Sequence, residues 1–252
     1  MYEYDDVFYN YINRGAQESA RRMLPPLLAA LPVPIESVLD VGCGAGAWLS
    51  VWKSLGAQVM GLDGSYVKTE QLLIAPEEFI AGDLRTHFSV DRRFSMAQSL
   101  EVAEHLPSSA AAGFVASLCQ HADLVLFSAA TPGQGGENHI NEQPYSYWRR
   151  LFQQQGFAMY DPVRQSVLGD KAVMPWYRYN TFLYVKEECA PHILAGLAAY
   201  KVDSGQAPPD IAPWIYRLRK RLTRVMPHPL STFLAIIKKN LFRLSLKLKS
   251  GE

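Results

Sequence analysis

Short apolar runs alternate with segments of helical spacing along the first two thirds of the chain. Each apolar run has the length of a buried strand, and several of the segments between runs carry apolar residues every three or four positions. The runs that predict strands are 38–41, 58–63, 78–84, 94–100, 123–128, 157–161 and 180–185. This series predicts an α/β fold with a mostly parallel sheet, helices on both faces and ligands at the carboxyl ends of the strands.

Residues 1–34, ahead of the first strand, form a predicted helical cap. Apolar residues recur at helical spacing between 5 and 31, and Pro25 and Pro26 are expected to interrupt that pattern. One or two helices would then cover the sheet. The alternative is that the cap closes over a ligand, which would be contacted by Tyr11, Arg14 or Ser19.

Three glycines at alternate positions follow the first strand. Gly42, Gly44 and Gly46 relieve the steric restriction on φ and let the backbone approach a ligand closely. The helix predicted next, over 48–55, offers unpaired N–H groups and a positive dipole end. The turn therefore favours a nucleotide-like ligand, although many such turns only close a strand against a helix.

Asp63 ends the second predicted strand, 21 residues beyond Gly42. Dinucleotide-type folds place an acid at this spacing, where it accepts hydrogen bonds from the ribose hydroxyls. The alternative role for Asp63 is to cap the following helix. A nicotinamide-dependent oxidoreductase remains a rival hypothesis, but Asp40 precedes the glycines, where it would repel a pyrophosphate.

Four motifs occur in order, each at a predicted strand end: 38–46, Asp63, Asp83 and 99–106. The series resembles that of the class I S-adenosylmethionine-dependent methyltransferases, especially their small-molecule O-methyltransferases, over residues 35–186. The resemblance implies a Rossmann-like domain at 35–190 with seven strands, the seventh inserted antiparallel between the fifth and sixth. It also implies S-adenosylmethionine as cofactor and S-adenosylhomocysteine as product.

The resemblance also implies the residues that hold the cofactor. Asp40 and the glycine turn would bind the methionine part, Asp63 the ribose, and Asp83 with Leu84 the adenine. A carboxylate suits each place, near a cation, a diol and an exocyclic amine. The full predicted set is Asp40, Gly42, Cys43, Gly44, Asp63, Gly64, Asp83, Leu84 and Leu100.

The loop after the fifth strand carries the preferred catalytic residue, His139. Segment 135–157 looks like the corresponding loop and helix of bacterial methyltransferases linked to glycan and secondary-metabolite pathways. A hydroxyl acceptor must lose its proton as the methyl group arrives, and imidazole titrates near neutral pH. His139 is therefore the predicted general base, unless it only pins the loop. The connection 170–179 is expected to wall the acceptor pocket with aromatic rings, or simply to pack.

Glu101, Glu104 and His105 form a second constellation after the fourth strand. They resemble the signature with which some O-methyltransferases bind a divalent cation, and such ligands suit Mg²⁺ or a transition metal. A full site needs more ligands, so no metal ligand is assigned. Glu104 as a helix cap and His105 as a hydrogen-bonding partner of the acceptor are the favoured roles, and both are counted as catalytic candidates.

Charge is distributed unevenly behind a net charge of +1. Residues 1–210 hold 15 basic and 23 acidic side chains, so this body is not suited to a phosphate backbone and no nucleic-acid partner is expected. Ten of the 25 Lys and Arg residues lie between Arg217 and Lys249, where Asp and Glu do not occur. Residues 191–252 are therefore predicted to be a basic amphipathic helical extension.

The extension contains two apolar stripes at helical spacing. A membrane surface, a protein partner or the acidic body itself are the possible contacts of 211–249, and a basic amphipathic helix favours an anionic membrane. A coiled coil would need an acidic partner. The stripes are Ile211, Trp214, Ile215, Leu218, Leu222 and Val225, then Leu230, Leu234, Ile237, Leu241, Leu244 and Leu248.

Several features bear on the compartment. No apolar run approaches the roughly 18 to 20 residues that span a bilayer, and the first residues are acidic, unlike a signal peptide. The three cysteines are far apart, which indicates reduced thiols. The expected location is the cytoplasm, and the basic tail makes the inner face of the membrane a second candidate. The expected function is O-methylation of a small-molecule or glycan acceptor, and a non-catalytic membrane adaptor is the alternative.

Overall fold

The sheet has seven strands in the order β3-β2-β1-β4-β5-β7-β6. This computed structural model describes residues 6–224 and 237. All strand pairs are parallel except those of β7, which runs antiparallel between β5 and β6. The predicted Rossmann-like sheet is thus confirmed. Its strands are β1 (Ser37–Val41), β2 (Gln58–Asp63), β3 (Phe79–Ala81), β4 (Met96–Leu100), β5 (Leu124–Ser128), β6 (Phe157–Tyr160) and β7 (Phe182–Lys186).

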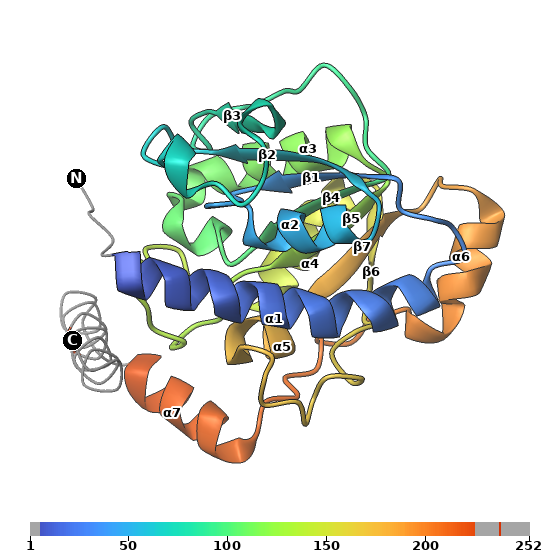
Figure 1. Ribbon diagram of the computed structural model, residues 1–252. Helices are drawn as coiled ribbons and strands as arrows, with labels where there is room; N and C mark the ends of the chain where they lie inside the picture. The colour runs from blue at the N-terminus through green and yellow to red at the C-terminus, as the bar shows by residue number, and fades with distance from the viewer. Residues whose placement is uncertain (1–5, 225–236, 238–252) are drawn as a thin grey trace.

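Helices cover both faces of the sheet, as Figure 1 shows. Val38 of β1 packs in the core beneath α1 and α2, whereas its neighbour Leu39 packs in the core beneath α3 and α4. Such alternation is the consequence of the two-residue period of a strand. The helices are α1 (Asp6–Ala30), α2 (Ala47–Ser54), α3 (Ala111–His121), α4 (Tyr145–Gln154), α5 (Pro175–Asn180), α6 (Pro191–Leu197) and α7 (Trp214–Arg224).

Helix α1 runs without interruption through Pro25 and Pro26, so the predicted break is wrong. Each interior proline removes a backbone donor and costs a helix about 3 kcal/mol. Leu24 and Leu27 on either side of the pair are completely buried, and burying a leucine contributes about 1.5–3 kcal/mol. Tertiary packing along this face therefore offsets the local penalty.

Ser19 fastens α1 to the segment before α5. Its hydroxyl donates to the carbonyl oxygen of Gly15 and accepts a hydrogen bond from the backbone N–H of Met174 at 3.0 Å. Segment 170–179, expected to be a plain connection, contains the start of the short helix α5, with Pro175 at its first position. Proline is favoured there because its fixed φ suits a helix start.

The chain after β7 packs closely on the body as far as residue 210. The backbone N–H of Asp161, just after β6, donates to the carbonyl oxygen of Tyr200 at 2.8 Å, and Arg149 of α4 donates to two carbonyl oxygens at 203 and 206. Helix α7 follows and contains the residues of the first predicted stripe from Trp214 to Leu222, whereas Ile211 lies ahead of it. No helix among the described residues is long and apolar enough to cross a membrane.

The rest of the extension lies almost entirely outside the described residues. Ile237 alone is described, as a helical residue with 38% of its surface exposed. The residues of the predicted stripes that fall outside are Val225, Leu230, Leu234, Leu241, Leu244 and Leu248.

Candidate active site

The glycine turn after β1 adopts backbone conformations that glycine favours. Gly42, Gly44 and Gly46 have φ values of 82°, 54° and 80°. A Cβ atom on Gly42 would also lie 2.3 Å from Cγ2 of Val102, which belongs to the segment after β4. The turn is therefore shaped both by left-handed backbone angles and by the close approach of a second strand end.

Asp63 connects the glycine turn to the end of β2. Its carboxylate accepts hydrogen bonds from the backbone N–H of Gly44 at 2.7 Å and of Gly64 at 2.6 Å. The hydroxyl of Tyr66 donates to the same carboxylate, although Tyr66 as a residue is 74% exposed. Sequence reasoning missed Tyr66, whose only signal is its position three residues after the predicted ribose acid. In this structure its hydroxyl makes the kind of bond expected of a ribose hydroxyl.

Asp40 lies in β1 with only 4% of its surface exposed. Burial raises the pKa of its carboxyl to about 7, against the opposing effect of the Gln98 amide and with a smaller rise from the charge of Asp63. A buried acid that is partly protonated at neutral pH ionises readily when a cation comes near. Asp40 is thus suited to meet an ammonium or sulfonium group.

The other predicted cofactor residues lie around the ends of the same strands. Asp83 is exposed and bonds the guanidinium of Arg85 through both carboxylate oxygens, which lowers the pKa of Asp83 to about 2. Gly61 leaves room in β2 for the thiol of Cys43, whose pKa is raised by burial. Besides Asp40 and Asp63, the buried members of the set are Cys43, Leu84 and Leu100.

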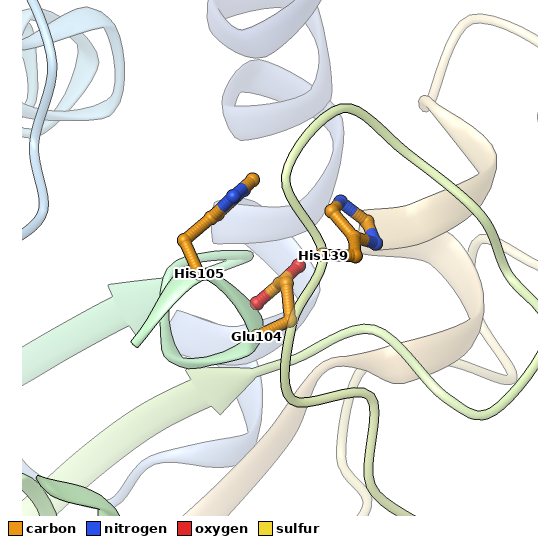
Figure 2. A group of neighbouring side chains, drawn as sticks. All are labelled: Glu104, His105 and His139. Atoms are coloured by element: carbon orange, nitrogen blue, oxygen red, sulfur yellow. The ribbon is translucent and has the colours of Figure 1, made fainter. Parts of the chain in front are cut away.

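A second group of polar side chains lies beyond β4 and β5. Figure 2 shows Glu104, His105 and His139, whose potential ligand atoms all lie within 4.8 Å of one another. The rings of the two histidines are 4.8 Å apart between centroids and nearly perpendicular. The structure therefore brings together all three predicted catalytic residues, which come from two separate loops.

Backbone hydrogen bonds hold these two loops together. The carbonyl oxygen of Glu104 accepts from the N–H groups of Ile140 and Asn141, each at 3.0 Å. The side-chain amide of Asn141 donates to the carbonyl oxygen of Ala103 at 3.3 Å. These contacts join the loop after β5 to the short 3-10 helix Ala103–His105, and they carry His139 to the end of β4.

Glu104 is completely buried, and neither carboxylate oxygen has a hydrogen-bond partner of ordinary geometry among the described residues. Burial, with the nearby charge of Glu101, raises the pKa of Glu104 well above its ordinary value. An unsatisfied buried carboxyl is costly for a fold. Its presence at a strand end therefore points to a partner that is bound during function.

His105 presents one unprotonated nitrogen to this group. Its Nδ1 lies 3.3 Å from the carbonyl oxygen of Asn138, and a carbonyl only accepts, so Nδ1 carries the proton of the neutral ring. Burial and the charge of His139 lower the pKa of His105 below its ordinary value, against the opposing effects of the hydrogen bond to Asn138 and the charge of Glu137. Nε2 of His105 is therefore an acceptor or ligand atom at neutral pH.

His139 is oriented by Glu142, which sequence reasoning missed. Nδ1 of His139 lies 3.0 Å from Oε1 of Glu142, whose carboxylate also accepts from the backbone N–H groups of Gly133 and Gly135, each at 2.7 Å. Burial opposes ionisation of Glu142, but these hydrogen bonds lower its pKa overall. An ionised Glu142 keeps the proton on Nδ1 of His139 and leaves Nε2 to accept one.

Glu101 belongs to a different network from the one predicted. Its carboxylate accepts hydrogen bonds from the side-chain amides of Gln134 at 2.6 Å and Asn180 at 3.2 Å. Glu101 also has a φ of 59°, which is rare for a residue other than glycine. The third member of the group that contains Glu104 and His105 is therefore His139, a residue of another loop.

Comparison with known proteins assigns the chain to a family. A family model described as a methyltransferase domain matches residues 12–161. Malonyl-(acyl-carrier protein) O-methyltransferase of Pseudescherichia vulneris is 37% identical over 65 residues, which are 25% of this chain and 26% of that enzyme. The match thus spans about a quarter of that relative.

Several solved structures share the fold. The sugar N-methyltransferase KedS8 from a Streptoalloteichus species has a TM-score of 0.55 at 15% identity, over 75% of this chain and 94% of its own. DesVI of Streptomyces venezuelae has a TM-score of 0.53 at 17% identity, over 73% and 100%. Magnesium protoporphyrin IX methyltransferase of Synechocystis PCC 6803, solved with S-adenosylmethionine bound, has a TM-score of 0.51 at 18% identity, over 74% and 86%.

The chain belongs to the methyltransferase domain family, because the family model matches more than half of it. Its sheet order and antiparallel β7 are those of the class I fold, as predicted. The chain is thus a member of that family with the fold of the class I methyltransferases.

Proposed function

We propose that this enzyme transfers a methyl group from S-adenosylmethionine to a hydroxyl oxygen of a small-molecule or glycan acceptor. The observation that carries the proposal is the pair formed by His139 and Glu142 beyond the sheet edge that carries the glycine turn. A hydroxyl holds its proton tightly at neutral pH, so an oriented base next to it favours oxygen as the acceptor atom. An amine acceptor has less need of such a base.

The cofactor would be held by the acids at the ends of β1, β2 and β3. Asp40 would face the ammonium and sulfonium charges, Asp63 would accept from the ribose hydroxyls, and Asp83 with Leu84 would contact the adenine. Asp63 already accepts two backbone N–H bonds, so its carboxylate is held in place before the ligand binds. The bound cofactor supplies an electrophilic methyl group on a sulfonium.

His139 would take the acceptor proton on Nε2 as the new oxygen–carbon bond forms. The bonding pair of the breaking carbon–sulfur bond stays with sulfur, and the ionised Glu142 stabilises the imidazolium. Most of the rate enhancement is expected to come from holding the acceptor oxygen in line with the methyl group, since correct positioning replaces a costly encounter.

A divalent cation is a second candidate for the same group. A buried carboxylate and two imidazoles are the ligand types of many transition-metal sites, and an ion would satisfy the unpartnered oxygens of Glu104. Glu104, His105 and His139 would hold it, and the ion would act as a Lewis acid on the acceptor oxygen. His139 would then be a ligand rather than a base.

Transfer of label from methyl-labelled S-adenosylmethionine to cell extracts tests the proposed function. We expect a labelled product with the methyl on oxygen, and its loss in His139→Ala. The control His192→Ala alters an exposed histidine on α6 and is expected to keep the activity. Label on nitrogen, or full activity in His139→Ala, would contradict the proposal. A protein that binds cofactor but modifies no acceptor would instead support the adaptor alternative.

Calorimetric titration of the full-length protein with Mn²⁺ or Zn²⁺ tests the second candidate without relying on activity. Binding at one site is expected to disappear in Glu104→Gln and to persist in the control Glu188→Gln, which changes an exposed residue. Titration without detectable binding would leave His139 as the base.

A further inference from the structure

Helix α7 docks on the body through its polar face. Nη2 of Arg219 donates to the carbonyl oxygen of Gln134 at 2.6 Å. The hydroxyl of Thr223 donates to the carbonyl oxygen of Gly133. Nζ of Lys220 donates to Oγ1 of Thr131 at 3.1 Å and to a carboxylate oxygen of Asp210 at 2.8 Å. Only 7% of the surface of Lys220 remains exposed to solvent.

Two backbones meet closely in this contact. A Cβ atom on Gly133 would lie 1.9 Å from the carbonyl oxygen of Lys220, and Gly133 has a φ of 82°. The N–H of Gly133 also donates to Glu142, the partner of His139. Helix α7 is thus joined through one glycine to the loop that carries the proposed base.

The apolar face of α7 points away from the body. Trp214, Ile215, Leu218 and Leu222 have exposed fractions of 66%, 64%, 45% and 59%. Their spacing places them on one side of a helix, within an arc of about 100°. The contact with the body is therefore made by the polar face, and the apolar stripe is left exposed. We call these four residues the outer stripe.

Basic residues border the outer stripe. Arg217, Arg221 and Arg224 are exposed on the side of the helix next to it. Residues 211–251 contain no Asp or Glu. An apolar stripe beside arginines is complementary to one kind of surface, the boundary between the acyl chains and the anionic headgroups of a bilayer. A second copy of the same helix would bring like charges together.

We propose that α7 binds the surface of an anionic lipid bilayer through the outer stripe, with Arg217, Arg221 and Arg224 against the headgroups. The polar face keeps its hydrogen bonds to residues 131–134 in the bound state. The loop of His139 is thereby held at the membrane, and the acceptor is an amphiphile presented by the bilayer. This last clause rests on the proposed function, whereas the membrane contact does not.

Vesicle co-sedimentation of the full-length protein tests the contact in the absence of cofactor and acceptor. We expect binding to phosphatidylcholine vesicles containing phosphatidylglycerol, and at least tenfold weaker binding for the variant Leu218→Ser with Leu222→Ser. Because both leucines are exposed, the variant is expected to keep the melting temperature of the wild type. Equal binding by the two proteins would overturn the proposal, since basic residues elsewhere would then explain it.

Quenching by lipids brominated on their acyl chains locates the contact. We expect bound protein to lose part of its tryptophan fluorescence, and Trp214→Phe to lose this quenching while the matched control Trp176→Phe keeps it. Equal quenching in the wild type and Trp214→Phe would overturn the proposal. So would a dimer, seen by sedimentation without lipid, that dissociates in the double serine variant, because the outer stripe would then belong to a second copy.

Discussion

Two buried acids at the same edge of the sheet have different surroundings. Asp63 accepts hydrogen bonds from two backbone N–H groups. Ionisation of Asp40 is instead opposed mainly by burial, which raises the pKa of its carboxyl to about 7. Backbone donors stabilise the charged form, and burial destabilises it. The affinity for the cofactor should therefore depend on pH through Asp40, whereas the carboxylate of Asp63 holds the glycine turn in place.

The pH dependence of S-adenosylhomocysteine binding tests the role of Asp40. Below pH 7 the carboxyl is protonated, and it must lose that proton to pair with the ligand's ammonium group. Affinity should therefore fall as the pH drops below 7, by up to about tenfold per unit, and level off above 7. Calorimetry in phosphate and Tris buffers should reveal the released proton. Asp40→Asn should abolish the dependence, and an unchanged slope in that variant would refute the role.

Asp63→Asn should weaken S-adenosylhomocysteine binding about 10- to 100-fold. The substitution removes a charge and turns one acceptor into a donor that faces the N–H group of either Gly44 or Gly64, and hydrogen bonds to charged groups contribute about 1.5–3 kcal/mol. Calorimetry measures the loss. Asp91→Asn, on an exposed loop, is the matched control, and an equal loss in both variants would contradict the ribose assignment.

Glu142→Gln should lower kcat about 10- to 100-fold while leaving S-adenosylhomocysteine affinity unchanged. Glu142 touches His139 and two backbone N–H groups but none of the predicted cofactor residues, so it acts as a positioning residue. The acceptor KM separates this role from a structural one, because loss of the carboxylate should impair proton transfer without changing how the acceptor is bound. A raised KM with an unchanged kcat would count against it.

At the scale of elements, loops and helices are joined by backbone contacts that depend on particular glycines. Gly133 has a left-handed φ and lies against the backbone of α7, whereas a Cβ atom on Gly113 of α3 would meet no atom within 4 Å. The two positions therefore form a natural pair for comparing a glycine that the fold requires with one that it does not.

Gly133→Ala should lower the free energy of unfolding by about 1–3 kcal/mol and loosen α7, because the added methyl group collides with a carbonyl oxygen and strains the backbone. Gly113→Ala should raise it by up to about 1 kcal/mol, since alanine suits a helix better. Denaturant unfolding measures both values, and hydrogen exchange follows α7. Equal effects at the two positions would show that α7 is not held through Gly133.

At the scale of the whole molecule, the sheet order places the ends of the parallel strands β1 and β4 side by side, at the point where the strand order reverses. Open α/β sheets bind their ligands at such a switch point. The glycine turn follows β1 and the group containing Glu104 follows β4, so the proposed cofactor and acceptor sites would meet there.

S-adenosylhomocysteine at a hundred times its Kd should stabilise the fold by about 2.7 kcal/mol. For a domain of this size the melting temperature should rise by about 5–10 °C. NAD at the same concentration should leave it unchanged, because Asp40 lies where a pyrophosphate would need to be. Scanning fluorimetry compares the two ligands, and equal stabilisation by NAD would revive the oxidoreductase hypothesis.

The sequence by itself determined the strand series, the glycine turn and the place of Asp63. These signals lie within segments of about twenty residues, where apolar periodicity and glycine conformations act locally. The insertion of β7 also followed, through the family resemblance. Local signals were misleading at Pro25 and Pro26, since packing along the buried face of α1, which includes Leu24 and Leu27, offsets the cost of the two prolines.

Only the tertiary structure decided which distant groups meet. The union of Glu104 with His139 depends on backbone hydrogen bonds between two loops. Glu101 is separated from that group by the side-chain amides of Gln134 and Asn180, which bind its carboxylate. Glu142 lies only three residues from His139, but the folding of that loop decided that their side chains meet. The orientation of α7 was decided in the same way, because the body offers carbonyl oxygens at Gly133 and Gln134, up to 90 residues away in the chain. An amphipathic pattern states that a helix has two faces, and the partners available in space decide which face is buried.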